Sequence, residues 1–371
     1  MIKEKTLIDK FLQNYPIKST NKSYRSAIKL FFSVIKKEPD TYFIEKQNYE
    51  EDVLTFWRHL NGHPPKTISG YISIIRTFLI ENNIELPAKA WRGIRNRTKG
   101  NRAVTEDKIP TPEQVKRILS HADVRGRALF TVLLQSGMRI GELVKINLDD
   151  IDFSCKPTKI RIRAEITKSG NQRYCFIGQE ATDSLKTYLE HRQAFLDTSI
   201  NRARTLQKFY NREQLKNKDD SRVFPYDDGQ IRSIWNRLLT YAKLGERDKR
   251  TNFHKMHPHV LRKFFRTHMS LTVQVDVVEA LMGHEGYLTE VYRRYSIEQL
   301  GEQYLLGEKN ISVFETTTDL SGINESLKEK DQEITNLQQQ VEELMDFKTK
   351  YLENLILKHE NQINGKKRKI P

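Results

Sequence analysis

The chain has 371 residues, of which 37% are hydrophobic and 30% are charged. This length exceeds what one small core organises, so it predicts two domains with an extension. No apolar run approaches the roughly 18 residues of a membrane helix, and the first residues lack the apolar segment of a secretory signal. With only two cysteines, a disulfide framework is excluded, and we expect a soluble protein of a reducing compartment.

The charge is strongly positive and unevenly distributed. The sequence holds 63 Lys and Arg against 48 Asp and Glu, a net charge of +15. Residues 321–371 contain nine acidic and nine basic residues, so the whole excess lies before residue 321. A surplus of this size indicates a polyanionic partner such as nucleic acid. The alternative is that the charge only maintains solubility or reflects a bias of the source proteome.

The first ninety residues predict a bundle of about four helices. Apolar residues recur at helical spacing within 24–35, 50–60 and 68–79. Thr20-Asn21 and the run from Pro64 to Thr67 supply helix start signals. We therefore expect a helical domain over residues 1–90.

The next segment, residues 91–105, contains five basic side chains and no acidic one. This pattern predicts an exposed basic linker. Such a linker can lie along phosphates and release counterions, or it can be a solvated tether. The basic residues of the predicted linker are Arg92, Arg95, Arg97, Lys99 and Arg102.

The second predicted domain covers residues 106–310 and is mostly helical. Pro112 follows Thr111 as the first residue of a helix, and 125–136 continues the helical pattern. Residues 158–167 alternate apolar and polar side chains, and 173–178 form a second strand-like run. The turn residues 168–171 between them predict a β-hairpin. Residues 198–222 are weakly patterned, which predicts an irregular or helical insertion.

The end of the chain predicts a coiled coil over residues 321–365. Apolar residues occupy heptad positions at Leu327, Ile334, Leu337, Val341, Leu344, Tyr351 and Leu355. Residues 327–355 could therefore bind a coiled-coil partner or a second copy. Ahead of the tail, residues 296–310 could dock on a neighbouring protomer or pack within their own chain. The basic run 366–369 is interpreted as a solvated end.

Three further motifs carry reactive side chains. Arg139 follows Gly137 at the start of a helix, where a lone arginine is usually a structural cation paired with a carboxylate such as Glu142. His259 and Arg262 are three residues apart and share one helix face. Gly283 and His284 precede three tyrosines, which at helical spacing are usually core residues. These tyrosines are Tyr287, Tyr292 and Tyr295.

The histidines at 254, 257 and 259 invite a zinc interpretation. Pro258 interrupts a helical register there, and no nearby cysteine completes a ligand set. We therefore expect no metal.

Taken together and in this order, the motifs resemble those of the tyrosine recombinases, the family of phage-type integrases and chromosome-dimer-resolving recombinases. The resemblance covers about residues 106–305. It implies a mainly α fold with a small β-hairpin or sheet, that is, an α+β catalytic domain. It also implies that residues 1–90 are a core-binding domain that clamps DNA.

The resemblance implies a role for each matched residue. Arg139 and Arg262 are the phosphate-binding pair, because guanidinium forks match phosphoryl oxygens, and Glu142 supports Arg139. His259 is implied as the base for a tyrosine whose free pKa is near 10. Lys168 protonates the departing 5′-oxygen, although it could also be a solvated turn lysine. His284 hydrogen-bonds the phosphate.

The nucleophile is assigned less directly. Family members often carry it nine residues after the Gly-His histidine, but that position is Arg293 here. A loop shorter by one residue makes Tyr292 the nucleophile, with Tyr295 as second choice. Tyr287 lies too close to His284 to reach the phosphate.

The function implied is site-specific recombination or integration of DNA. The enzyme would cut and rejoin duplex DNA through a covalent 3′-phosphotyrosine, without metal, ATP or another cofactor. Its partners would be double-stranded DNA and further copies, as a tetramer on paired sites, either in the cytoplasm at the nucleoid or encoded by a virus or mobile element. The alternatives are an inactive DNA-binding or architectural protein of the same fold, a type IB topoisomerase-like enzyme, and an assembly protein organised by the coiled coil.

Overall fold

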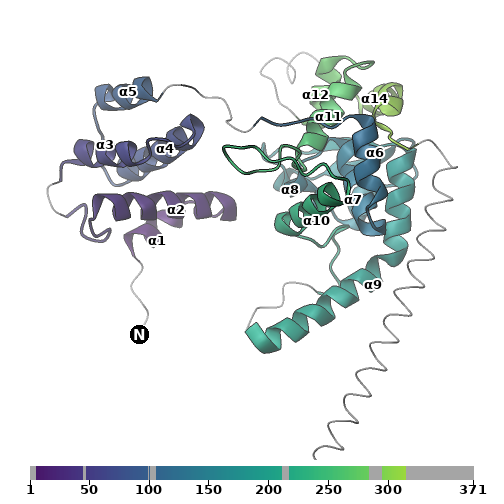
Figure 1. Cartoon of the computed structure of the whole chain (residues 1–371), viewed down its shortest axis with the longest axis horizontal. Coiled ribbons are helices and arrows are strands. Elements are labelled where there is room, and N and C mark those ends of the chain that lie inside the picture. Colours follow the sequence, from purple (N-terminus) through teal and green to yellow (C-terminus); the bar gives the residue numbers. More distant parts are fainter. Residues whose placement is uncertain are drawn as a thin grey trace, which may run out of the picture. The chain divides into compact units, whose positions relative to one another are not determined.

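The computed structural model describes residues 6–44, 47–98, 100, 106–210, 217–283 and 295–314, with the side chains of 202 and 205–210 left aside. Two compact units make up the chain (Figure 1). One contains Met1–Glu106 with Asp248–Asn252, and the other contains Asp107–Arg247 with Phe253–Pro371. The described residues are mainly helical with one small antiparallel sheet, which confirms the predicted fold class.

The N-terminal unit is a bundle of short helices around an aromatic core. Its helices are α1 (Leu7–Leu12), α2 (Lys18–Ile35), α3 (Tyr49–His59), α4 (Pro65–Glu81) and α5 (Ala88–Arg97). Phe11 meets Phe78 edge to face at 5.0 Å between ring centroids, and Phe31 meets Phe56 at 5.4 Å. Such edge-to-face pairs add to the burial of the rings. Pro65 begins α4 as predicted, but α2 begins at Lys18, ahead of the predicted Thr20-Asn21.

The prediction of a linker over 91–105 is wrong for its first part. Residues 91–97 form most of α5, and Trp91 and Ile94 are buried, 8% and 4% exposed. These two residues lie three apart, so both reach the hydrophobic core of the N-terminal unit. The sequence did not predict this helix because only two of its residues are apolar and buried, and a segment with so few apolar residues among arginines resembles a charged linker.

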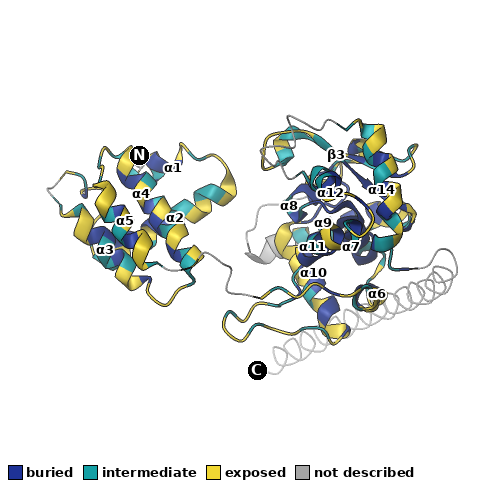
Figure 2. Ribbon diagram, turned by 90° about the horizontal axis from the view of Figure 1, so that it is seen from above, coloured by how far each residue is buried: buried dark blue, intermediate teal, exposed yellow. Residues whose placement is uncertain are grey.

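The second unit is organised around one buried helix. Its helices are α6 (Pro112–Ser120), α7 (Val124–Ser136), α8 (Ile140–Leu143), α9 (Gln179–Tyr210), α10 (Asp228–Tyr241), α11 (Val260–Met269), α12 (Val275–Met282) and α14 (Ile297–Ile311). Every residue of α7 from Gly126 on is buried. Figure 2 shows the buried residues of this unit gathered where α7 and α11 lie. Thr111 caps α6 in a capping box with Gln114, as the Pro112 signal predicted.

The sheet of the second unit has three antiparallel strands in the order β1 (Ile151–Asp152), β2 (Thr158–Ile162) and β3 (Arg173–Ile177). The predicted hairpin is β2 and β3, with Ile162 opposite Arg173 as the last pair before the turn. The predicted first strand is too long. Residues after Ile162 leave the ladder, and 164–166 form a 3₁₀ turn.

The structure describes two further segments, residues 198–222 and residues 296–310, each in part as helix. The insertion expected over 198–222 begins as a continuation of α9, which ends at Tyr210 and buries Ile200. Residues 296–310 pack within their own chain, since α14 lies against α11. There the buried Tyr304 donates its hydroxyl to the Gln135 carbonyl at 3.0 Å, and the Glu308 carboxylate accepts from the Gln179 amide at 2.8 Å.

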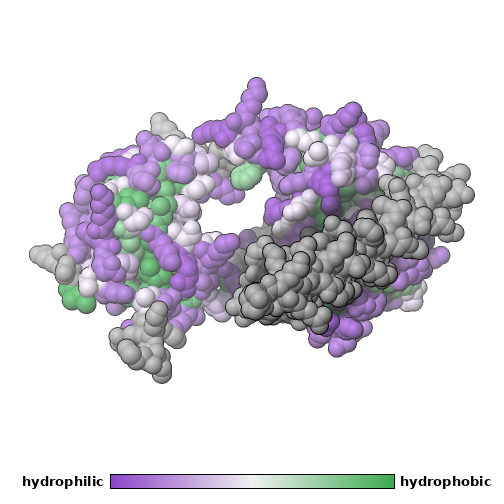
Figure 3. All heavy atoms as spheres, turned by 60° about the horizontal axis from the view of Figure 1, so that its bottom comes forward, coloured by the Kyte–Doolittle hydropathy of each residue, from purple (hydrophilic) through white to green (hydrophobic). Residues whose placement is uncertain are grey.

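The predicted coiled coil at 321–365 and the basic run at 366–369 lie outside the described residues. Among the described helices, none is long and apolar enough to span a membrane. The face of each unit seen in Figure 3 is mostly hydrophilic, with an apolar zone on the N-terminal unit.

Candidate active site

A tight turn between α7 and α8 places Arg139. Gly137 ends α7 with φ +60°, and a Cβ there would lie 2.5 Å from Cδ1 of Phe265 on α11. Both the left-handed backbone and the close approach require glycine. The turn directs the chain so that Arg139 becomes the N-cap residue of α8.

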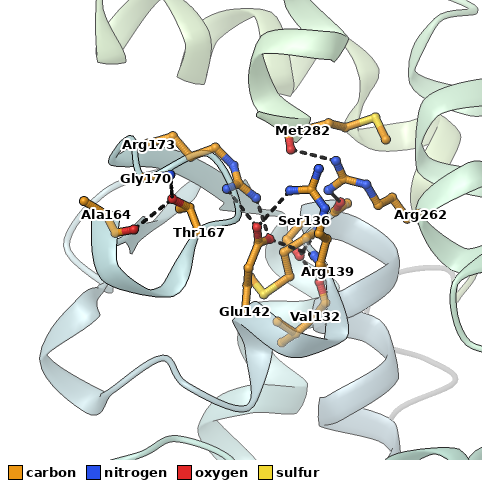
Figure 4. A network of polar contacts seen from close by, with 12 residues as sticks. Val132, Ser136, Arg139, Glu142, Ala164, Thr167, Gly170, Arg173, Arg262 and Met282 are labelled. Carbon is orange, nitrogen blue, oxygen red and sulfur yellow. Dashed lines mark hydrogen bonds and ion pairs between the residues drawn. The ribbon is translucent and has the colours of Figure 1, made fainter. Parts of the chain in front are cut away.

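Glu142 organises the arginines around this turn (Figure 4). Its buried carboxylate accepts from the Arg139 amide at 2.8 Å and from Arg139 Nη1 at 3.0 Å. It also accepts two bonds from Arg173, at 2.6 and 3.1 Å. Burial alone would raise the pKa of Glu142, but the bonds and charge of Arg173, then those of Arg139, lower it below its ordinary value. Glu142 is therefore ionised at neutral pH.

Arg262 is buried, 3% exposed, and is held by backbone carbonyls. It donates to the carbonyls of Gly137 and, at 2.8 Å, of Met282. Burial and then the charge of Arg139 lower the pKa of Arg262 to about 10. The guanidinium still carries its charge at neutral pH, and two carbonyls fix its orientation. Thus the structure brings Arg139, Arg262 and Glu142 together, as the sequence predicted.

His259 lies immediately before α11 and is exposed. Partial loss of solvation first, and the charge of Arg262 second, lower the pKa of His259. A histidine in this setting is neutral at physiological pH and can accept a proton. Its ring stacks on that of His257 at 6.2 Å between centroids.

His257 is in turn held by an acidic residue. Its Nε2 lies 3.0 Å from Oδ1 of Asp107, and Lys263 pairs with the other oxygen of that carboxylate. Burial tends to raise the pKa of Asp107, but the bonds from Lys263 and His257 lower it overall. This cluster connects the start of the second unit to the segment that carries His259.

Lys168 lies in the turn of the hairpin and is exposed. The turn is ordered by Thr167, whose hydroxyl donates to the Ala164 carbonyl at 2.9 Å and accepts from the Gly170 amide at 3.0 Å. Figure 4 shows this turn beside Arg173. An exposed amine on a turn is free to approach a bound substrate.

Several predicted residues lie outside the described residues, namely His284, Tyr287, Tyr292, Lys99 and Arg102. Tyr295 is described, and it is half-buried and packs against the hydrophobic core of the second unit.

The other predicted linker residues belong to the N-terminal unit. Arg92, Arg95 and Arg97 are exposed on α5. Arg97 lies over the Trp57 ring at 5.9 Å, and Arg95 lines a hollow with Arg76 between α4 and α5. These cations are available to an anionic partner of this unit.

Sequence reasoning missed Arg173. The residue is opposite Ile162, and strand alternation places it on the same face as the buried Cys175 and Ile177. An arginine on the inward face of a strand is the signal that could have found it, because a buried cation needs a carboxylate partner.

The arrangement suits the binding of an anion. Two guanidiniums, those of Arg139 and Arg173, pair with the Glu142 carboxylate, and that of Arg262 lies near enough to feel their charges. These four side chains together carry two net positive charges at the end of α7. Such fixed forks match phosphate oxygens better than a single ammonium does. Within the described residues, no group of three or more His, Cys, Asp and Glu side chains is arranged to hold a metal ion.

Tyrosine recombinases are among the known proteins that this chain resembles. Tyrosine recombinase XerD of Proteus mirabilis is 29% identical over 199 residues, 51% of this chain and 55% of the relative. That alignment spans little more than half the length of the relative. Tyrosine recombinase XerC of Thermodesulfovibrio yellowstonii is 24% identical over 306 residues, 79% of this chain and 91% of the relative.

The fold has counterparts among solved structures. A lambda integrase dimer bound to a COC′ core site has a TM-score of 0.51 at 12% identity, covering 78% of this chain and 98% of that chain. A lambda integrase tetramer bound to a Holliday junction has a TM-score of 0.50 at 13% identity, covering 78% and 79%. The model of the phage integrase family matches residues 108–298, slightly more than half of the 371 residues. The chain therefore belongs to the phage integrase family.

Proposed function

We propose that the protein is a site-specific DNA recombinase or integrase that cuts and rejoins duplex DNA through a covalent 3′-phosphotyrosine. The observation that carries this proposal is the convergence of Arg139 and Arg262, with surplus positive charge, in a chain of the phage integrase family. A phosphodiester is the anion that such a family member would hold there.

The site residues divide the chemistry between them. Arg139 and Arg262 bind the phosphoryl oxygens and stabilise the charge that develops as the tyrosine attacks. His259 accepts the tyrosine proton, and Lys168 gives a proton to the departing 5′-oxygen. His284 donates to a phosphate oxygen. The covalent link stores the energy of the broken bond, so ATP is not needed, and the guanidiniums supply the positive charge that a metal would.

Tyr292 is the proposed nucleophile. The half-buried packing of Tyr295 against the core of the second unit supports a structural role for that residue. A nucleophile must instead reach the phosphate between the arginines.

Double-stranded DNA is the proposed partner. Arg92, Arg95 and Arg97, with Lys99 and Arg102, would contact its phosphates, since each neutralised phosphate releases counterions. Because lambda integrase is found as a dimer on a core site and a tetramer on a Holliday junction, we propose that this protein also acts as a tetramer on paired sites. The proposed setting is the cytoplasm, at the nucleoid or on a mobile element.

A suicide-substrate assay tests the proposal. Nicked duplexes from a candidate attachment region are incubated with the wild type, Tyr292→Phe and Tyr295→Phe, and denaturation-resistant adducts are counted. We expect an adduct with the wild type and Tyr295→Phe but none with Tyr292→Phe. Absence of an adduct with the wild type, on DNA that it binds, would support an inactive DNA-binding protein instead. Relaxation of supercoils without strand exchange between sites would indicate a topoisomerase-like enzyme.

A further inference from the structure

Arg173 is tied to the arginine cluster by a two-bond ion pair. It donates Nη2 to Oε2 of Glu142 at 2.6 Å and Nη1 to Oε1 at 3.1 Å, and its side chain is only 12% exposed. A two-bond pair of this kind fixes the orientation of a guanidinium as well as its position. The same carboxylate holds Arg139, so Arg173 and Arg139 are oriented by one shared partner.

Arg173 also marks the point where the hairpin ladder ends. Its pairing with Ile162 is the last one before the turn that carries Lys168. Beyond that pair, the bonds of Thr167 order the turn internally. The ion pair of Arg173 with Glu142 therefore attaches the base of the Lys168 turn to α8.

The side chain of Arg173 also lies against the end of α12. Gly283 ends α12 with φ +68°, and a Cβ there would lie 2.4 Å from Cδ and 2.5 Å from Nε of Arg173. Any side chain at position 283 would displace the arginine. Position 284, the next in the chain, is the predicted phosphate-binding histidine, which lies outside the described residues. Arg173 thus contacts or adjoins the segments that carry Arg139 and Lys168, and it lies against Gly283 at the end of α12.

We propose that Arg173 is a positioning residue for strand cleavage: it holds the Lys168 turn so that the lysine can protonate the departing 5′-oxygen. This inference rests on the proposed function. In the step concerned, the tyrosine Oη bonds to phosphorus, the bond from phosphorus to the 5′-oxygen breaks, and that oxygen takes a proton from Lys168. Without Arg173 the β3 side of the turn loses its ion pair with α8, while the bond from Arg163 to the Lys145 carbonyl remains on the β2 side. The lysine is then held less firmly, and proton transfer slows.

The test changes the leaving group of the DNA so that cleavage no longer needs a proton from a general acid. Cleavage rates are measured on a suicide duplex with either the ordinary 5′-oxygen or a sulfur in its place at the scissile phosphate. A thiolate leaves without a proton, because a thiol is far more acidic than an alcohol, as the Cys pKa of about 8.5 illustrates. General-acid assistance then becomes unnecessary. The variants are Arg173→Gln, Lys168→Met and their double substitution.

Arg161→Gln is the matched control. Arg161 lies on β2 of the same hairpin and donates Nε and Nη2 to the buried Asp150 at 3.1 and 3.0 Å. Asp150 retains Arg163 at 3.1 Å when Arg161 is replaced, just as Glu142 retains Arg139 when Arg173 is replaced. The control therefore removes the ion pair of a more exposed arginine with a buried carboxylate on the same hairpin, without touching Glu142 or Gly283.

We expect Arg173→Gln to cleave the oxygen substrate at least about tenfold more slowly than the wild type does. Its cleavage rate on the sulfur substrate should lie within about threefold of the wild-type rate. This is the pattern expected when general-acid catalysis is lost. The double variant should be no slower than Lys168→Met, and Arg161→Gln should match the wild type on both substrates.

Equal slowing of Arg173→Gln on both substrates would overturn the inference, because the arginine would then act on phosphate binding or on folding alone. Wild-type rates on both would overturn it as well. If the wild type itself forms no adduct on DNA that it binds, the proposed function fails, and the inference fails with it.

Discussion

At the scale of single residues, Glu142 is the shared carboxylate partner of Arg139 and Arg173. Its pairing with Arg139 was expected from the spacing of three residues, and the two are joined at 3.0 Å. The second partner, Arg173, lies 31 positions away, and local periodicity carries no information about such a contact. The sequence therefore predicts the residues that carry reactive groups better than those that hold them in place.

Replacement of Glu142 should destabilise the protein in a pH-dependent way. Glu142→Gln leaves two guanidiniums with no carboxylate between them, which should cost about 3 kcal/mol of unfolding free energy at pH 7. Because the pKa of Glu142 is lowered on folding, its contribution is complete above the ordinary value of 4.5 and is lost as the pH falls through the folded value. Urea unfolding of both proteins should show the difference shrinking in acid. A difference that stayed constant down to about pH 2 would contradict this assignment.

His259 should leave its signature in the pH profile of cleavage. A general base must be neutral, and the pKa of His259 is lowered from 6.5 by partial loss of solvation and by Arg262. The acid limb of the cleavage rate should therefore have its midpoint below 6.5, and His259→Ala should lack that limb. Single-turnover rates between about pH 5 and 8 measure this, in the range where histidine titrates. A midpoint above 6.5 would argue against His259 as the base.

At the scale of elements, apolar periodicity predicts helices well where the apolar stripe is long. It succeeds for α4, whose Ile68, Ile72 and Phe78 are buried, and for the hairpin, where strand residues flank turn chemistry. It fails at α5, because only Trp91 and Ile94 anchor that helix among arginines. It also extends β2 too far, since alternation continues through residues that have left the ladder.

The reassignment of residues 91–97 from linker to helix is testable. Trp91→Ala should destabilise the N-terminal unit by about 3 kcal/mol, because it removes a buried aromatic side chain. Arg92→Ala, at an exposed neighbouring position, should change stability by less than about 0.5 kcal/mol. Hydrogen exchange of peptides from α2 to α5 in the full chain measures both. Equal protection in the two variants would mean that residues 91–97 act as a tether after all.

At the scale of the whole molecule, the net charge of +15 predicts salt-dependent binding to duplex DNA. If Arg92 and Arg95 contact phosphates, each replacement by alanine should reduce the slope of log affinity against log salt by about one. Asn96→Ala, exposed on the same helix, is the control and should leave the slope unchanged. Titrations between about 50 and 200 mM salt supply the slopes. An unaltered slope in both arginine variants would remove α5 from the DNA interface.

The most direct test of the central claim is to map the covalent bond between the protein and its DNA. After suicide cleavage, trypsin separates Tyr292 from Tyr295, because Arg293 and Arg294 lie between them. Tyr287 shares the tryptic peptide of Tyr292, and fragmentation of that peptide distinguishes the two. Mass spectrometry of the adduct should find the 3′-phosphate of the cleaved strand on the peptide that contains Tyr292. A 5′-linkage, attachment through a residue other than tyrosine, or no linkage on bound DNA would contradict the account.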